Sequence, residues 1–151
     1  MSEAITLRLA GPHEAGLVRD FTRAAYAAWV PLIGREPLPM TADYAAALAT
    51  HRFDLLYADG ELAGLIETVA DGDLLLVVNV AVRPDREGQG LGRRLMAHAE
   101  TLATDQGLKG LRLYTNQRFE RNVRLYQALG YAIDSEDAGP RGVTVHMSKR
   151  F

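Results

Sequence analysis

The chain has 151 residues, of which 48% are hydrophobic and 24% charged, so we expect one globular domain over residues 1–151 with a single core. Its 17 Lys and Arg against 19 Asp and Glu give a net charge of −2, which argues against an overall attraction to nucleic acid or to a membrane surface. The absence of cysteine excludes disulfides, thiolate metal ligands and a cysteine nucleophile, and without an apolar leader or a long apolar run we expect a cytoplasmic protein.

The first fifty residues predict a strand followed by two helices. Apolar and polar residues alternate over 5–9, which is the period of a half-buried strand. Residues 13–29 have helical apolar spacing, and the prolines and glycine of 31–39 are expected to break that helix before a shorter one over 43–49.

Residues 52–82 predict three strands in an antiparallel meander. The dipeptides Asp59-Gly60 and Asp71-Gly72 divide three apolar segments, and Asp-Gly between strands is a strong hairpin signal. The last segment, 74–82, is almost continuously apolar, so we expect it at the centre of the sheet with both faces covered.

The second half predicts helix, strand, helix, strand, strand. Apolar residues recur at helical spacing over 91–107, a strand follows at 111–115, and 118–129 forms another helix that Gly130 closes. Two strands at 131–136 and 142–149 complete a mixed α/β (α+β) chain.

The stretch RPDREGQGLGRRL, residues 83–95, carries glycine at every second position: Gly88, Gly90 and Gly92. A central strand that passes through such a turn into a helix aims backbone N–H groups at one point, which suits a phosphate. A tight turn whose glycines serve only packing is the alternative. The dinucleotide and P-loop patterns both fail, because Arg93 stands where the former needs glycine and Arg93-Arg94 follows Gly92 where the latter needs Lys-Ser or Lys-Thr.

The glycine loop, taken with the segment that follows it along the chain, resembles a known family. VAVRPDREGQGLGRRLMAHAE together with LRLYTNQRFERNVRLYQALGY, within residues 80–131, resembles the two core segments of the GNAT superfamily of acetyl-CoA-dependent N-acetyltransferases. The resemblance implies a mostly antiparallel seven-stranded sheet, splayed at its centre near residues 80–82 and flanked by about four helices. It also implies acetyl-CoA as co-substrate.

The coenzyme site that the resemblance implies comprises the splayed strand, the glycine loop and one residue of the following helix. Glu87 stands where the family usually has Arg or Gln, so we expect its side chain to point outward while Arg86 or Arg93 supplies positive charge. Asn79 interrupts the apolar strand, either at the splay or as a buried amide that a neighbouring strand satisfies. The implied residues are Val80, Ala81, Val82, Glu87, Gly88, Gln89, Gly90, Leu91, Gly92, Arg93 and Asn122.

Two residues are candidates for proton transfer. Tyr126 resembles the family tyrosine whose hydroxyl lies near the coenzyme sulfur, and a phenol can protonate or hydrogen-bond the thiolate leaving group. Glu67 is the one carboxylate inside the apolar stretch AGLIETVA, where burial would raise its pKa toward that of a useful base. The alternatives are an ordinary core aromatic for Tyr126 and an outward-facing strand residue for Glu67.

The acceptor pocket is expected from the segment between the first two helices, residues 26–44. Its aromatic and apolar residues Tyr26, Trp29, Leu32 and Tyr44 are candidates for the wall, and Arg35 and Glu36 for charge selection. The same residues could instead anchor a proline-stiffened loop. The four histidines show no ligand spacing, so no metal is inferred.

The sequence therefore predicts direct transfer of an acetyl group from acetyl-CoA to a primary amine of a small molecule or peptide, in a ternary complex. A backbone N–H near Val82 is the expected oxyanion donor. The alternative function is a non-catalytic acyl-CoA-binding sensor or accessory module. Nucleic-acid binding through Arg118, Arg121 and Arg124 is disfavoured because the chain is net acidic and has no aromatic stacking platform beside them. A homodimer through residues 142–151 is possible.

Overall fold

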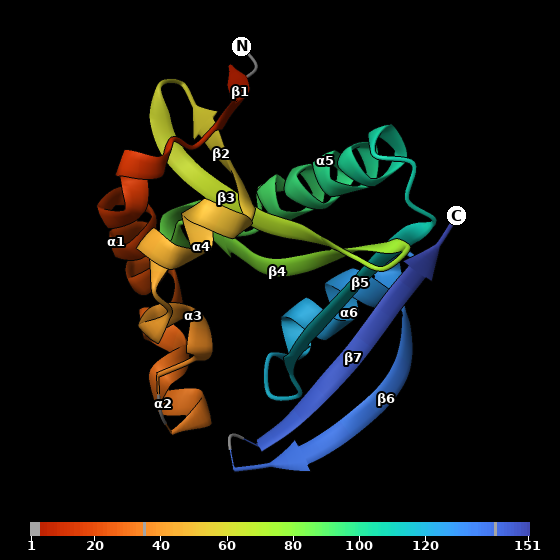
Figure 1. Ribbon diagram of the computed structural model, residues 1–151. Helices are drawn as coiled ribbons and strands as arrows, with labels where there is room; N and C mark the ends of the chain where they lie inside the picture. Colours follow the sequence, from red (N-terminus) through yellow and green to blue (C-terminus); the bar gives the residue numbers. More distant parts are fainter. Residues whose placement is uncertain (1–3, 35, 141) are drawn as a thin grey trace.

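The computed structural model describes residues 4–34, 36–140 and 142–151, and its strands form one seven-stranded sheet (Figure 1). The strand order is β1-β2-β3-β4-β5-β7-β6, and every neighbouring pair is antiparallel except β4 and β5, which run parallel. The strands are β1 (Ile5–Leu9), β2 (Arg52–Ala58), β3 (Glu61–Asp71), β4 (Leu74–Val82), β5 (Gly110–Asn116), β6 (Ala132–Gly139) and β7 (Gly142–Arg150). The mixed, mostly antiparallel sheet expected from the sequence is confirmed.

The helices lie where the apolar periodicity predicts them, with one difference. They are α1 (Ala15–Tyr26), α2 (Val30–Ile33), α3 (Leu38–Thr41), α4 (Tyr44–Thr50), α5 (Leu91–Asp105) and α6 (Glu120–Ala128). The helical path does not break at Pro31, because that proline lies in the first turn of α2, where a missing N–H costs nothing. The path ends at Gly34, which is also one of the predicted breaks and whose φ of 78° suits glycine.

Helices cover both faces of the sheet, and two apolar clusters result. One cluster joins α1, α3 and α4 to Phe53, Leu55 and Leu65 on one face. The other joins α5 and Tyr126 of α6 to strand residues that include Ile66 and Leu111. Figure 1 shows α1 to α4 gathered on one side, with α5 and α6 on the other. Burial on both faces explains the continuously apolar β4.

The sheet splays at its centre, as expected. Pairing between β4 and β5 joins only Leu75–Val77 to Leu111–Leu113, although β5 continues along β7 as far as Asn116. The two strands then diverge (Figure 1). A bulge lies at the same point, because Glu67 pairs with Asn79 and Thr68 with Val77, which leaves Val78 as the extra residue of β4. Bulges bend a strand and re-aim its side chains.

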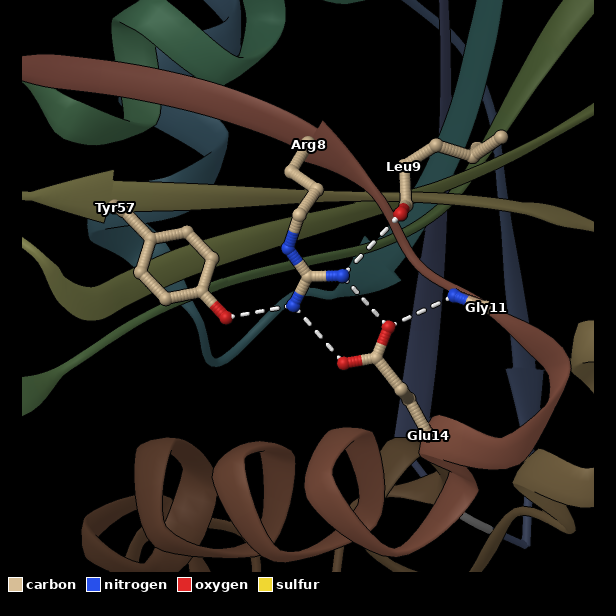
Figure 2. Close-up of polar contacts among 5 residues, drawn as sticks. All are labelled: Arg8, Leu9, Gly11, Glu14 and Tyr57. Atoms are coloured by element: carbon tan, nitrogen blue, oxygen red, sulfur yellow. Dashed lines mark hydrogen bonds and ion pairs between the residues drawn. The ribbon is translucent and has the colours of Figure 1, made fainter.

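A polar network fixes the start of α1 on the sheet (Figure 2). Arg8 of β1 makes two hydrogen bonds to the Glu14 carboxylate, at 2.8 and 2.9 Å, and a third, at 2.8 Å, to the Tyr57 hydroxyl of β2. The Gly11 N–H also donates to Glu14. These bonds hold the pKa of Glu14 well below its usual value, at about 2. The network therefore orients α1, which carries Tyr26 to the splay.

Candidate active site

Two adjoining cavities open where β4 and β5 diverge. The central cavity, about 360 Å³, lies between the diverging strands and the α3–α4 segment, and its walls include Glu67, Asn79 and Tyr114. The loop cavity, about 290 Å³, lies between the end of β4, the glycine loop and α6. Tyr26, Val80, Asn122 and Tyr126 line both, so the two spaces meet at these four side chains.

The loop cavity has the features of a phosphate cradle. Gly88 and Gly90 have φ of 78° and 82° with open space where a Cβ would stand, so the backbone conformation itself requires glycine at both positions. Gly90 is the N-cap of the 15-residue α5 and gives that helix no side-chain cap. The first N–H groups of α5 thus remain available to an anion at the positive end of the helix dipole.

Three of the described arginines line the loop cavity, and Glu87 forms an ion pair with one of them. Arg86, Arg93 and Arg121 line the loop cavity. The Glu87 carboxylate lies 3.3 Å from Nη1 of Arg121, so it bridges the loop to α6. Ten of the eleven implied coenzyme residues line this cavity, and the exposed Gln89 does not.

Asn79 is a buried amide and also lies at the splay, so the two predictions made for it both hold. Its Oδ1 accepts a hydrogen bond from the Tyr26 hydroxyl at 2.8 Å, and that hydroxyl also lies 3.0 Å from the Val80 carbonyl oxygen. Its Nδ2 is buried and has no partner among the described residues, although the side chain lines the central cavity. A buried donor of this kind fits an acceptor atom supplied by a ligand.

Glu67 points inward rather than to solvent. Its side chain is only 5% exposed, and Oε2 lies 2.6 Å from Nδ1 of His51, which is 28% exposed. Burial raises the pKa of Glu67, and the hydrogen bond from His51 partly opposes that rise. Both side chains line the central cavity.

Tyr126 stands where the two cavities meet. It is 8% exposed, and its ring packs against Tyr131 at a centroid distance of 6.0 Å. Burial raises the pKa of Tyr126 to about 12, so the hydroxyl keeps its proton at neutral pH. It serves the core and lines the cavities at once.

The four residues expected to form an acceptor wall are not brought together. Tyr26 and Tyr44 line the central cavity, whereas Trp29 packs against Phe119 with tilted rings, 4.5 Å between centroids, and lines the loop cavity. Leu32 is 47% exposed and lines neither, although its carbonyl accepts a hydrogen bond from Arg118. Glu36 lines the central cavity, and Arg35 lies outside the described residues.

Sequence reasoning missed His51 and the free donor of Asn79. The four histidines show no metal-ligand spacing, and a single carboxylate contact leaves no spacing signal in the sequence. The alternation of the meander could not have found His51, because a register shift between β2 and β3 decides which residues share a face with Glu67. Within the described residues no three His, Cys, Asp or Glu side chains group as a metal site, and none of the described helices is long and apolar enough to span a membrane.

Comparison with known proteins identifies the family. Residues 18–131, which include the splay, the glycine loop and Tyr126, match the family described as Acetyltransferase (GNAT) family. The chain belongs to the GNAT acetyltransferases.

Curated GNAT relatives include two acetyltransferases. The chain is 34% identical over 90 residues to mycothiol acetyltransferase of Nocardiopsis dassonvillei, which covers 60% of this chain and 26% of the relative. It is 31% identical over 83 residues to streptothricin acetyltransferase of Streptomyces lavendulae, covering 54% and 44% respectively. The chain thus matches less than half the length of either relative.

Solved structures share the GNAT fold along nearly the whole chain. The ribosomal-protein-S18-alanine N-acetyltransferase of Escherichia coli has a TM-score of 0.79 at 20% identity and covers 97% of this chain and 94% of its own. PaiA N-acetyltransferase of Thermoplasma acidophilum, solved in complex with coenzyme A, also has a TM-score of 0.79, at 16% identity, covering 98% and 99%. Acetyl-CoA is the co-substrate of GNAT acetyltransferases, and these likenesses show the fold.

Proposed function

We propose that this chain transfers the acetyl group of acetyl-CoA to a primary amine of a small molecule or peptide, by direct attack in a ternary complex. The observation that carries the proposal is the junction of the two cavities. An uncapped helix N-terminus with two positive-φ glycines lies on one side, and a buried carboxylate paired with a partly exposed imidazole lies on the other. Tyr126 lies between them.

The residues of the loop cavity fit the pyrophosphate of coenzyme A. Backbone amides of the glycine loop and of the first turn of α5 are donors without competing side chains, because Gly88, Gly90 and Gly92 have none. The Glu87–Arg121 pair supports this assignment despite the departure at position 87, since it places a guanidinium at the cavity wall. We assign the pantetheine arm to the edge of β4 that β5 leaves unpaired after Val77.

In this proposal different parts of the cavity wall carry out different steps of the reaction. Acetyl-CoA supplies an activated thioester. Fixing it and the amine in line is worth roughly 7 to 11 kcal/mol of the barrier. We assign proton removal from the amine to the cavity wall that contains Glu67. Oxyanion stabilisation falls to donors along β4, either the expected backbone N–H near Val82 or Asn79 Nδ2, which has no protein partner among the described residues.

Tyr126 acts in this proposal as a hydrogen-bond donor to the departing sulfur. A pKa of about 12 lies well above that of a thiol such as the cysteine side chain, about 8.5, so complete proton transfer to the thiolate would be uphill. A hydrogen bond stabilises the thiolate without that cost. The phenol therefore helps the thiolate to leave while it keeps its own proton.

Isothermal titration with acetyl-CoA tests the proposal first. Gly92→Glu should abolish binding, because Gly92 lies in the first turn of α5 on the cavity wall. Gly92→Ala is the matched control, since a Cβ there would make an ordinary 3.6 Å contact with Leu125. No binding by the native chain at millimolar acetyl-CoA would overturn the proposal.

Thiol release in the presence of amines then tests turnover. Streptothricin and a peptide with an N-terminal alanine are the first acceptors to try, because proteins similar to this chain are named for acting on them. Binding of acetyl-CoA without thiol release for any primary amine would favour the acyl-CoA sensor.

A further inference from the structure

The Glu67–His51 pair reaches from the buried cavity wall toward solvent. Glu67 is almost fully enclosed, whereas the His51 side chain is 28% exposed, and Oε2 and Nδ1 are 2.6 Å apart. Both line the central cavity beside Asn79 and the splay. The imidazole is therefore the member of the pair that an incoming amine and bulk water can both approach.

The backbone holds this pair in place at both ends. His51 is the C-cap of α4, where its N–H donates to the Ala47 carbonyl at 2.7 Å, and β2 begins at the next residue. Phe53 pairs directly with Glu67 across β2 and β3, so His51, two residues before Phe53, lies on the same face of the sheet as Glu67. A helix end and a strand pairing fix the relative position of the two side chains.

Apart from His51 and Glu67, the titratable side chains that line the central cavity in the described part of the chain are four tyrosines and Glu36. Tyr26 of α1, Tyr44 of α4 and Tyr126 of α6 are buried, and burial raises the pKa of Tyr44 and of Tyr126 to about 12 and that of Tyr26 further, so all three remain protonated. Tyr114 of β5 also lines the cavity and is 39% exposed. Glu36, before α3, is solvent-exposed. Among the described residues no Lys or Arg lines this cavity.

We propose that His51 is the base that deprotonates the acceptor amine and that Glu67 is its positioning residue. The assignment rests on the proposed acetyl transfer. Glu67 accepts the Nδ1–H hydrogen bond, which leaves the lone pair on Nε2. As the amine attacks, its N–H bond breaks and an N–H bond forms at Nε2. The imidazolium is balanced by the Glu67 carboxylate and then releases that proton to water, which restores the starting tautomer.

Variants of His51 and Glu67 test this assignment at saturating acetyl-CoA with the best acceptor of the amine screen. His51→Ala should lower kcat about 100-fold or more, with acetyl-CoA affinity unchanged by titration, because His51 does not line the loop cavity. Free imidazole should restore part of that kcat, in proportion to its unprotonated concentration. Glu67→Gln should also lower kcat and should gain nothing from imidazole, because His51 still fills the site.

Matched controls separate this role from a structural one. His146→Ala removes a histidine of similar exposure, 32%, that also contacts a carboxylate, Asp137 at 2.8 Å, but lies outside both cavities. It should keep native kcat. Combining His51→Ala with Glu67→Gln should cost no more than the larger single loss, because the two residues act as one unit.

The possible outcomes are distinct. A native chain that turns over no amine overturns the proposed function. A native chain that is active, while His51→Ala stays within twofold of it or is not restored by imidazole, overturns the role of His51 alone. Nitrogen-15 NMR of the apo protein is independent of the acceptor. It should show neutral His51 as the Nδ1–H tautomer, and the Nε2–H tautomer would contradict the assignment.

Discussion

Single side chains at the junction serve both the core and the proposed chemistry. Tyr126, Asn79 and Glu67 are all at most 8% exposed, yet each lines a cavity. Burial raises the pKa values of Tyr126 and Glu67 and leaves Asn79 Nδ2 without a partner among the described residues, which is costly unless a ligand uses these groups.

Replacing the Tyr126 hydroxyl separates an enzyme from a sensor. Tyr126→Phe should lower kcat about 10- to 100-fold and leave the acetyl-CoA Kd within twofold, because the hydroxyl assists the leaving thiolate rather than binding. Steady-state kinetics and isothermal titration measure both. Tyr131→Phe is the control, since Tyr131 is buried but lines neither cavity. Unchanged kcat in Tyr126→Phe would remove the assigned role.

Ionised Glu67 should lower the free energy of unfolding at neutral pH. Its pKa is raised, so the folded chain binds the proton more tightly than the unfolded chain, and stability falls as pH rises from about 4.5 through the folded-state pKa. Glu67→Gln should therefore melt higher than the native chain at pH 7, and the difference should vanish below pH 4. Calorimetry at the two pH values measures it, and a lower Tm for the variant at pH 7 would contradict the expected trade-off.

At the scale of elements, the strand–loop–helix unit needs its glycines for different reasons. Gly90→Ala should destabilise the fold by about 1–2 kcal/mol, because φ is 82° there. Gly92→Ala should cost little, since its φ is not in the left-handed region and a Cβ makes an ordinary contact. Urea unfolding of the two variants is the measurement. Equal losses would mean that packing, not conformation, requires glycine in this turn.

The joint between β1 and α1 depends on a charged hydrogen-bond network. Glu14→Gln should lower the free energy of unfolding at pH 7 by a small but measurable amount, because the Arg8 side chain that it contacts is 47% solvent-exposed. The lowered pKa of Glu14 means that this contribution is present above about pH 4.5 and is lost as pH falls toward about 2. Urea unfolding at pH 7 and pH 2.5 should show the difference shrinking. A difference independent of pH would contradict the ionic role.

In the whole molecule, the splay is the place where one edge of β4 is no longer paired with β5, so its backbone N–H and C=O groups can bind a ligand. Acetyl-CoA at 100 times its Kd should add about 2.7 kcal/mol to the free energy of unfolding. Hydrogen exchange should slow most at residues 78–82 of β4 and in the glycine loop, and little at β6, which is far along the sheet order. Protection confined to other strands would place the coenzyme elsewhere.

Local patterns in the sequence determined the elements and the loop. Alternation, helical stripes and Asp-Gly turns depend on neighbouring residues, and they predicted all seven strands and the four longer helices. The predicted break at Pro31 was wrong because the proline lies at a helix start, where its missing N–H is harmless, whereas the predicted break at Gly34 is observed. The family pattern at Gly88, Gly90 and Tyr126 was readable for the same reason, since it lies within short contiguous segments.

Only the tertiary structure decided the composition of the site. Continuing the pairs Ala58–Glu61 and Tyr57–Leu62 along the strands would place Arg52 opposite Glu67, but the irregularity between Leu56 and Tyr57 shifts the register and places Phe53 there. That one-residue shift puts His51 on the face of Glu67, because side chains alternate across a strand. Pairing register and strand divergence arise from contacts between distant segments, which no local pattern encodes.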